Sequence, residues 1–165
     1  MDMKNPFESP TTFRLHRAEY LVGWIVCTAL IILHWNEIRL LPAIILFAYI
    51  DLIGYIPGAI AFRRSPDGRI SKNYYIAYNV MHSMITQGAV IAIWGFTIGW
   101  EWALIVIPWH LFADRGVYGN FLKPFRLPFE PHPAPGYQRL MDELSAATPA
   151  TTGDRTPEAA RVSGT

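Results

Sequence analysis

The fold is decided by residues 40–62, LLPAIILFAYIDLIGYIPGAIAF, in which Asp51 is the only charged residue. The hydrocarbon core of a bilayer requires about 20 consecutive, mostly apolar residues in a helix. Residues 40–62 meet this requirement, and a water-soluble helix would instead need a polar outer face. We therefore interpret them as a membrane-spanning helix.

Three further stretches have the same character, at residues 19–35, 74–97 and 100–118. The whole chain is 52% hydrophobic and 16% charged, whereas about a quarter of the residues are charged in a typical soluble domain. This composition excludes an ordinary soluble enzyme. A net charge of +1 and the single cysteine, Cys27, exclude a nucleic-acid-binding protein and a disulfide scaffold. We predict an all-α polytopic protein of the cell membrane, a four-helix antiparallel bundle whose main partner is the lipid bilayer.

The distribution of basic residues predicts the topology. All but one of the 14 Lys and Arg residues lie before the first span, between the second and third, or from Arg115 at the end of the fourth span onward, and Arg39 is the exception. The positive-inside rule then places both termini in the cytoplasm. The turns at residues 36–39 and 98–99 are short, so we expect spans one and two to form one hairpin, and spans three and four another.

The composition also divides the chain into four parts. Residues 1–18 form a basic cytoplasmic or interfacial segment, residues 19–118 the transmembrane domain, and residues 119–144 a Pro-rich cytoplasmic segment. Residues 145–165 are mostly Ala, Thr, Pro and Gly, which cannot bury a core. We expect this last part to be disordered.

Six polar residues stand inside the predicted spans, where an ionisable group costs about 2.5–3.5 kcal/mol at mid-depth. They are Glu19, Asp51, Asn79, His82, His110 and Asp114. Helical spacing puts His110 and Asp114 on one face. Their depths are compatible with one funnel that opens to the cytoplasm and ends near Asp51. Gly54 and Gly58 permit close helix approach, and Pro57 interrupts its helix and frees a backbone carbonyl near the same level.

Two imidazoles and two carboxylates are suited to a divalent ion such as Zn, Fe or Mn. We predict metal ligands at His82, His110, Asp114 and Asp51, with the alternative that Asp114 orients His110. Asp51, Glu19 and Arg115 are candidate catalytic groups.

The residues that follow Asp114 have candidate roles of their own. Arg115, at the predicted mouth, would offer a fixed cation to a phosphate or carboxylate headgroup. Gly116 and Gly119 would let the backbone approach a ligand.

Three motifs carry a resemblance to a known family. They are Asp51-Leu-Ile-Gly54-Tyr55, Tyr78-Asn79-Val-Met-His82 and His110-Leu-Phe-Ala-Asp114-Arg115-Gly116. Together they resemble a family of short bacterial four-helix membrane proteins, a domain of unknown function, over roughly residues 17–123. The final Arg115-to-Asn120 segment departs from the family's spacing, which affects any role for Tyr118. The resemblance implies the fold and no activity.

Three functional hypotheses remain open. The first is a metal-dependent enzyme acting on a lipid-like or isoprenoid substrate that enters from the bilayer. The second is a metal-free isomerase or cyclase with Asp51 as proton donor. The third is a transport or interaction subunit, possible as a homo-oligomer, whose polar residues hold helices together. For Asn79 taken alone we favour this structural role, and we interpret His34 and Glu37 as a solvated surface pair and Cys27 as a small apolar filler.

Overall fold

The structure is a computed structural model, which describes residues 10–130, 136, 139–140, 142–143 and 146. All regular elements in these residues are helical. The α-helices are α1 (Pro10–Leu33), α2 (Leu40–Gly54), α3 (Ile56–Arg64), α4 (Lys72–Met81), α5 (Met84–Thr97) and α6 (Val106–Phe112). Shorter elements are the 3₁₀ turns η1 (Trp35–Glu37) and η2 (Trp102–Ile105) and a π-helical turn, η3 (Ala113–Tyr118).

Two helical stretches are long and apolar enough to cross a membrane, Thr11–Leu33 and Leu40–Arg64. A third candidate is the pair α4 and α5, which meet at an angle of 54°. The last helical stretch, from Trp102 to Tyr118, is just short of the length of about 20 residues that a bilayer core requires. The all-helical prediction and two to three candidate spans are therefore confirmed, and the complete four-span bundle stays a prediction.

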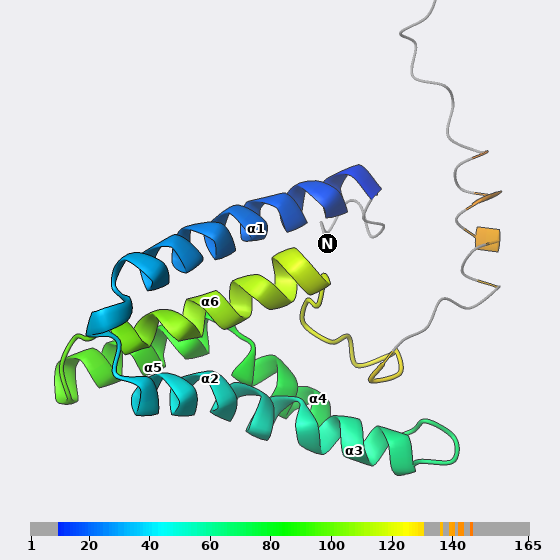
Figure 1. Ribbon diagram of the computed structural model, residues 1–165. Helices are drawn as coiled ribbons and strands as arrows, with labels where there is room; N and C mark the ends of the chain where they lie inside the picture. The colour runs from blue at the N-terminus through cyan, green and yellow to red at the C-terminus, as the bar shows by residue number, and fades with distance from the viewer. Residues whose placement is uncertain (1–9, 131–135, 137–138, 141, 144–145, 147–165) are drawn as a thin grey trace, which may run out of the picture. The chain divides into compact units, whose positions relative to one another are not determined.

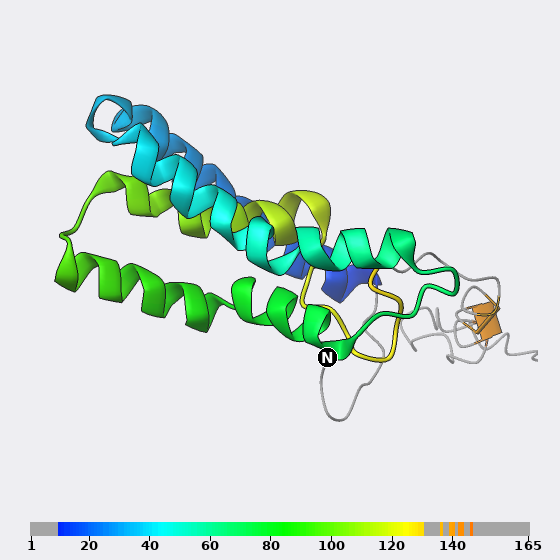
Figure 2. The same cartoon turned by 90° about the horizontal axis from the view of Figure 1, so that it is seen from below.

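The second span is nearly continuous although Pro57 lies within it. The backbone N–H of Tyr55 still donates to the Asp51 carbonyl at 2.9 Å, and Ala59 donates to Tyr55 at 2.9 Å. Pro57 has no N–H to offer the carbonyl four residues earlier, yet Leu40–Arg64 remains one candidate span. Figure 2 shows α2 and α3 end to end, and α4 and α5 end to end.

The expected pairing of the first two spans is wrong. Among the described residues α1 packs on α6 and η3, whereas α2 packs on α4, η2 and α6. In Figure 1 the ribbon of α6 runs between α1 and α2. The short turn keeps the ends of the first two spans close, but the last helical segment separates the rest. The third and fourth segments do pack on each other, through α5 and α6.

Small residues allow these close contacts. A Cβ added at Gly116 would lie 2.6 Å from the Leu21 nitrogen and 2.9 Å from the Tyr20 carbonyl carbon. Gly116 is therefore required where η3 meets α1, which corrects the expectation that it admits a ligand. Gly119 has φ +72° and ends η3 in the left-handed conformation.

At the opposite end of the helices, polar side chains join the two turns. Arg39 contacts Glu101 at 3.4 Å, and Glu101 accepts a hydrogen bond from the Trp94 indole at 2.8 Å. His34 pairs with Glu37 at 2.8 Å on the surface, as predicted, and its ring stacks on Trp102. Cys27 is buried and free, which fits its role as a filler.

The predictions for the two ends of the chain have different outcomes. α1 runs without a break across the predicted boundary at residues 18 and 19. The C-terminal part, residues 131–165, forms a unit of its own. Its described residues, Gly136, Arg139, Leu140, Asp142, Glu143 and Ala146, are helical and exposed. The predicted disordered tail otherwise lies outside the described residues.

Candidate metal centre

A break in the third span places His82. α4 ends at Met81, and α5 begins at Met84 after Ser83 caps it by accepting a hydrogen bond from the Thr86 backbone N–H. His82 lies between the two helices with φ −97° and ψ 10°. Residues 74–97, which we predicted as one span, are therefore divided between two helices that meet at 54°.

The break leaves carbonyls without helical partners, and side chains satisfy them. Gln87 donates to the Met81 carbonyl at 2.7 Å and accepts a hydrogen bond from the Tyr49 hydroxyl. Arg115 donates to the His82 carbonyl at 3.0 Å and to the Tyr20 hydroxyl at 3.0 Å. Because buried carbonyls without partners are costly, these contacts stabilise the bent geometry that presents His82.

Four side chains from three segments meet beside the break. His82 Nε2 lies 3.3 Å from Asp51 Oδ1 and 3.4 Å from Asp114 Oδ2. His110 Nε2 lies 3.6 Å from Asp51 Oδ2 and 3.3 Å from Asp114 Oδ2. Each imidazole nitrogen therefore contacts both carboxylates. Asp51, His82 and His110 each offer a ligand atom within 4.8 Å of the others, close enough to hold a metal ion.

Burial differs across this cluster of four. The side chains of His82 and His110 are 5% and 4% exposed, and that of Asp114 is 18% exposed. Asp51 is 40% exposed, and its neighbours Leu52 and Ile53 are exposed apolar residues. The cluster is therefore closed on the histidine side and open at Asp51.

The hydrogen bond on the far side of His82 fixes its tautomer. Nδ1 lies 3.0 Å from the Tyr78 carbonyl, and a carbonyl only accepts, so Nδ1 carries the proton. In the neutral ring the lone pair of Nε2 then points at two carboxylates. This repulsive arrangement needs a cation, either a second proton on the ring or a metal ion. Metal-binding histidines usually donate their other N–H to a carbonyl or carboxylate in this way.

The distances around the cluster fit a small divalent ion. Two ligands bound at 2.0–2.1 Å with tetrahedral angles lie about 3.3–3.4 Å apart. Three of the four nitrogen-to-oxygen distances are 3.3 or 3.4 Å, and the fourth is 3.6 Å. These nitrogen-to-oxygen distances match the spacing of two ligands on one ion, and Asp51, His82 and His110 are the set whose ligand atoms all lie within 4.8 Å of one another.

One buried oxygen supports the same interpretation. Asp114 Oδ2 is among the buried side-chain atoms without a hydrogen bond, although it lies between the two imidazoles. Buried polar atoms of this kind are rare and usually have a partner such as an ion. Within the described residues, the contacts of Asp114 Oδ2 are therefore with the two imidazole nitrogens that would share an ion with it.

Two residues predicted to serve the site have different surroundings. Glu19 is exposed on α1 and is not part of the cluster. Arg115 is half-buried, with its guanidinium over the Tyr20 ring at 5.0 Å. Its contacts with Tyr20 and the His82 carbonyl hold the backbone at His82 in position. A headgroup-binding role for Arg115 and a catalytic role for Glu19 stay predictions.

A segment whose packing was not predicted from the sequence lies against the site. Residues 119–130, which we call the strap, follow η3 and lie against α3 and α4. Asn79 and the backbone of Lys123 exchange two hydrogen bonds, at 2.9 and 2.7 Å. Phe129 is fully buried, and a Cβ at Gly58 would overlap its ring. Asn79 therefore has the structural role predicted for it, and the close partner of Gly58 is a strap residue.

The strap also places a cation next to the site. The Lys123 ammonium lies 4.7 Å from the centre of the Tyr78 ring and donates to the Phe129 carbonyl at 2.6 Å. Burial lowers the pKa of Lys123 below its usual range. The Tyr78 ring in turn stacks on His82 at 4.0 Å. The aromatic spacing between Phe125 and Phe129 was the available signal for a packed segment, but the surrounding prolines favoured a loop.

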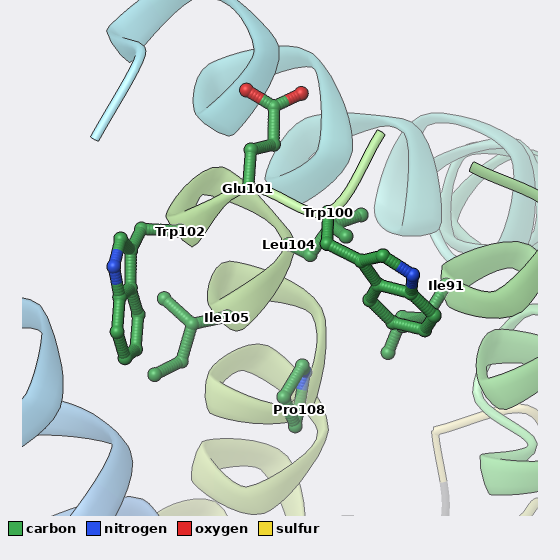
Figure 3. A pocket seen from close by; sticks show the side chains of 7 residues that line it. All are labelled: Ile91, Trp100, Glu101, Trp102, Leu104, Ile105 and Pro108. Atoms are coloured by element: carbon green, nitrogen blue, oxygen red, sulfur yellow. The ribbon is translucent and has the colours of Figure 1, made fainter. Parts of the chain in front are cut away.

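Two cavities of about 440 Å³ each lie away from the cluster of four. One lies near the turn between α5 and η2 and is lined by Ile91, Trp100, Glu101, Trp102, Leu104, Ile105 and Pro108. In Figure 3 its Glu101 carboxylate points away from Pro108, which leaves a mainly apolar wall. The other cavity lies beside the strap and is described below.

Comparisons of the chain with protein-family models, curated proteins and solved structures found no match. The family resemblance of the three motifs therefore stays a prediction.

Proposed function

We propose that this chain is a four-span membrane protein with a divalent-metal centre, and that the centre serves an enzyme acting on a lipid-like substrate. The observation that carries the proposal is the convergence of His82, His110 and two carboxylates with ligand spacing. Imidazole and carboxylate ligands favour Zn, Fe or Mn over softer ions.

The division of roles follows from burial and hydrogen bonding. His82 and His110 are buried and would be fixed ligands, and the Tyr78 carbonyl holds the His82 ring by its Nδ1–H. Asp51 is the more exposed carboxylate and would complete the ligand set on the open side. Asp114 contacts both imidazoles and would either bind the ion or orient His110. A bound ion would supply Lewis-acid activation of water or of a substrate oxygen.

The exposed side of Asp51 supports a substrate from the bilayer. Leu52 and Ile53 beside it are 58% and 53% exposed, and Phe47, which contacts the His110 ring, is 39% exposed. On a candidate membrane span, exposed apolar side chains face lipid. A substrate that reaches Asp51 from this side would travel within the hydrocarbon region.

A metal-free acid–base enzyme is the second candidate, because a second proton on each imidazole would also relieve the repulsion in the cluster. An assay of lipid turnover distinguishes the metal-dependent enzyme from the metal-free enzyme. The purified protein is reconstituted with a bacterial polar lipid extract, with and without prior removal of metal by a chelator. We expect a lipid product that disappears on chelation, returns with Zn, Fe or Mn, and is absent in His110→Ala. Product formation unaffected by chelation would favour the metal-free enzyme.

The proposed topology predicts that the α3–α4 loop and the C-terminus lie on the cytoplasmic side. This loop contains Arg69, and Arg63 and Arg64 end α3 beside it. Reporter fusions after Asp67 and at the C-terminus should both give cytoplasmic signals. A fusion after Asn36 serves as the control on the opposite side. A periplasmic signal from either of the first two would contradict the four-span topology.

A further inference from the structure

The second cavity lies where the α3–α4 loop meets the strap. Its volume is about 440 Å³, and its lining includes Arg69 from the loop, Lys72 from the start of α4 and Arg126 from the strap. Two stretches far apart in the sequence, residues 69–72 and the strap, thus bring three cations to one hollow. None of the four residues of the metal centre lines it.

The lining carries a net positive charge because three cations, Arg69, Lys72 and Arg126, face a single carboxylate, Asp67. Asp67 accepts hydrogen bonds from the Ser65 hydroxyl at 2.9 Å and from the Arg69 backbone N–H at 3.1 Å. These contacts lower the pKa of Asp67. Its pairing with the Arg69 side chain is long, at 3.8 Å. An anionic ligand would therefore encounter three cations and one carboxylate that is held in a turn.

The hollow is built by fixed contacts. The hydroxyl of buried Tyr75 donates to the Leu127 carbonyl at 2.9 Å, which joins α4 to the strap behind the cavity. The paired hydrogen bonds between Asn79 and Lys123 hold the strap further along α4. The cavity walls are thus tied to a helix rather than formed by a loose loop.

Apolar side chains at the same cavity indicate the source of the anion. Phe125 and Leu127 line it, and each is 51% exposed. The cavity is lined by the loop between α3 and α4 and by the start of α4, and both helices belong to candidate spans, so it lies at an end of these spans. Cations beside exposed apolar groups at this level are typical of sites that bind lipid headgroups.

We propose that this cavity binds the phosphate headgroup of an anionic membrane lipid. Arg69 and Arg126 bind the phosphate oxygens through their guanidinium groups. Lys72 adds a third positive charge. Phe125 and Leu127 contact the glycerol and the first part of the acyl chains. This site does not depend on the proposed metal centre.

The test measures lipid binding to the full-length protein in detergent. A short-chain phosphatidylglycerol is titrated, and bound lipid is counted by native mass spectrometry. We expect Arg69→Gln and Arg126→Gln each to weaken binding about fivefold, the effect of one cation near a charged lipid surface. Arg64→Gln is the matched control, because Arg64 is an exposed cation at the end of α3 that does not line the cavity.

Three outcomes would overturn the proposal. An equal loss in Arg64→Gln would show a general charge effect. Equal binding of a zwitterionic phosphatidylcholine would show that the phosphatidylglycerol charge is not recognised. Displacement of the lipid by inorganic phosphate at equal concentration would identify a site for free phosphate. Both lining arginines are exposed, and Lys72→Gln gives a third variant with the same expected loss if either fails to fold.

Discussion

Alanine in place of His82 is expected to remove a divalent ion that the wild-type protein binds at a ratio of about one per chain. The change deletes a buried ligand and leaves Asp51 and Asp114 without the nitrogen that lies 3.3 and 3.4 Å from them. We expect affinity to fall more than about 100-fold, beyond the effect of losing an outer hydrogen-bond partner of a ligand. Elemental analysis of the purified protein measures the ratio directly.

The matched control for this substitution is His34→Ala. His34 is also a histidine with a nearby carboxylate, but its pair with Glu37 lies on the surface at the other end of the helices. Its loss should leave the metal content unchanged. Equal metal content in His82→Ala and wild type, or loss of metal in both histidine variants, would contradict the assignment. Size-exclusion chromatography checks that each variant is folded and monodisperse.

The second large effect is expected at Gly116. A methyl group there would lie 2.6 Å from the Leu21 nitrogen and 2.8 Å from its Cα, so η3 and α1 would have to separate. Because backbone atoms of a helix cannot move aside locally, we expect Gly116→Ala to reduce stability by about 3 kcal/mol, the upper end of the usual range for overpacking. Thermal unfolding in detergent measures this as a clear decrease in the melting temperature.

Gly88→Ala is the control for that effect. A Cβ at Gly88, within α5, would meet no atom within 4 Å. Alanine there should be neutral or stabilise the protein by up to about 1 kcal/mol through its higher helix propensity. Similar decreases in both variants would mean that the close approach of η3 to α1 does not explain the result at Gly116.

The cluster could be predicted from the sequence because its residue types are rare in apolar helices. Asp51 is the only charged residue of its predicted span, His82 and His110 lie within long hydrophobic stretches, and the spacing of His110 and Asp114 puts them on one helical face. The structure brings all four together, with distances of 3.3–3.6 Å. Their similar depths in the membrane follow from the helical rise per residue alone.

The break at His82, the placement of α1 and the exposure of Glu19 depend on tertiary contacts, which a local sequence pattern does not show. The break at His82 and Ser83 is stable because Gln87 and Arg115 satisfy the freed carbonyls, and Arg115 comes from a distant element. The placement of α1 on η3 depends on Gly116, whose local sequence equally favours a helix end. Glu19 had a suitable residue type and depth, but its side chain lies on the exposed face of α1.

The packing of the strap could not be predicted from its local sequence. Its prolines predicted an open cytoplasmic segment, yet Phe129 is fully buried and Tyr55 donates to Glu130 at 2.7 Å. Proline fixes the backbone and removes donors, but it does not prevent a neighbouring aromatic ring from packing. The contact became possible because Gly58 leaves space on α3 for the Phe129 ring.

X-ray absorption at the edge of the bound metal tests the central claim most directly, because it reports the ligand atoms of the ion itself. The account predicts nitrogen and oxygen ligands, at about 2.0–2.1 Å if the ion is Zn, with outer-shell scattering from two imidazoles. Cys27 is the chain's single thiol, so a metal–sulfur distance of about 2.3 Å would place the ion elsewhere. A spectrum without imidazole scattering would likewise contradict a centre built on His82 and His110.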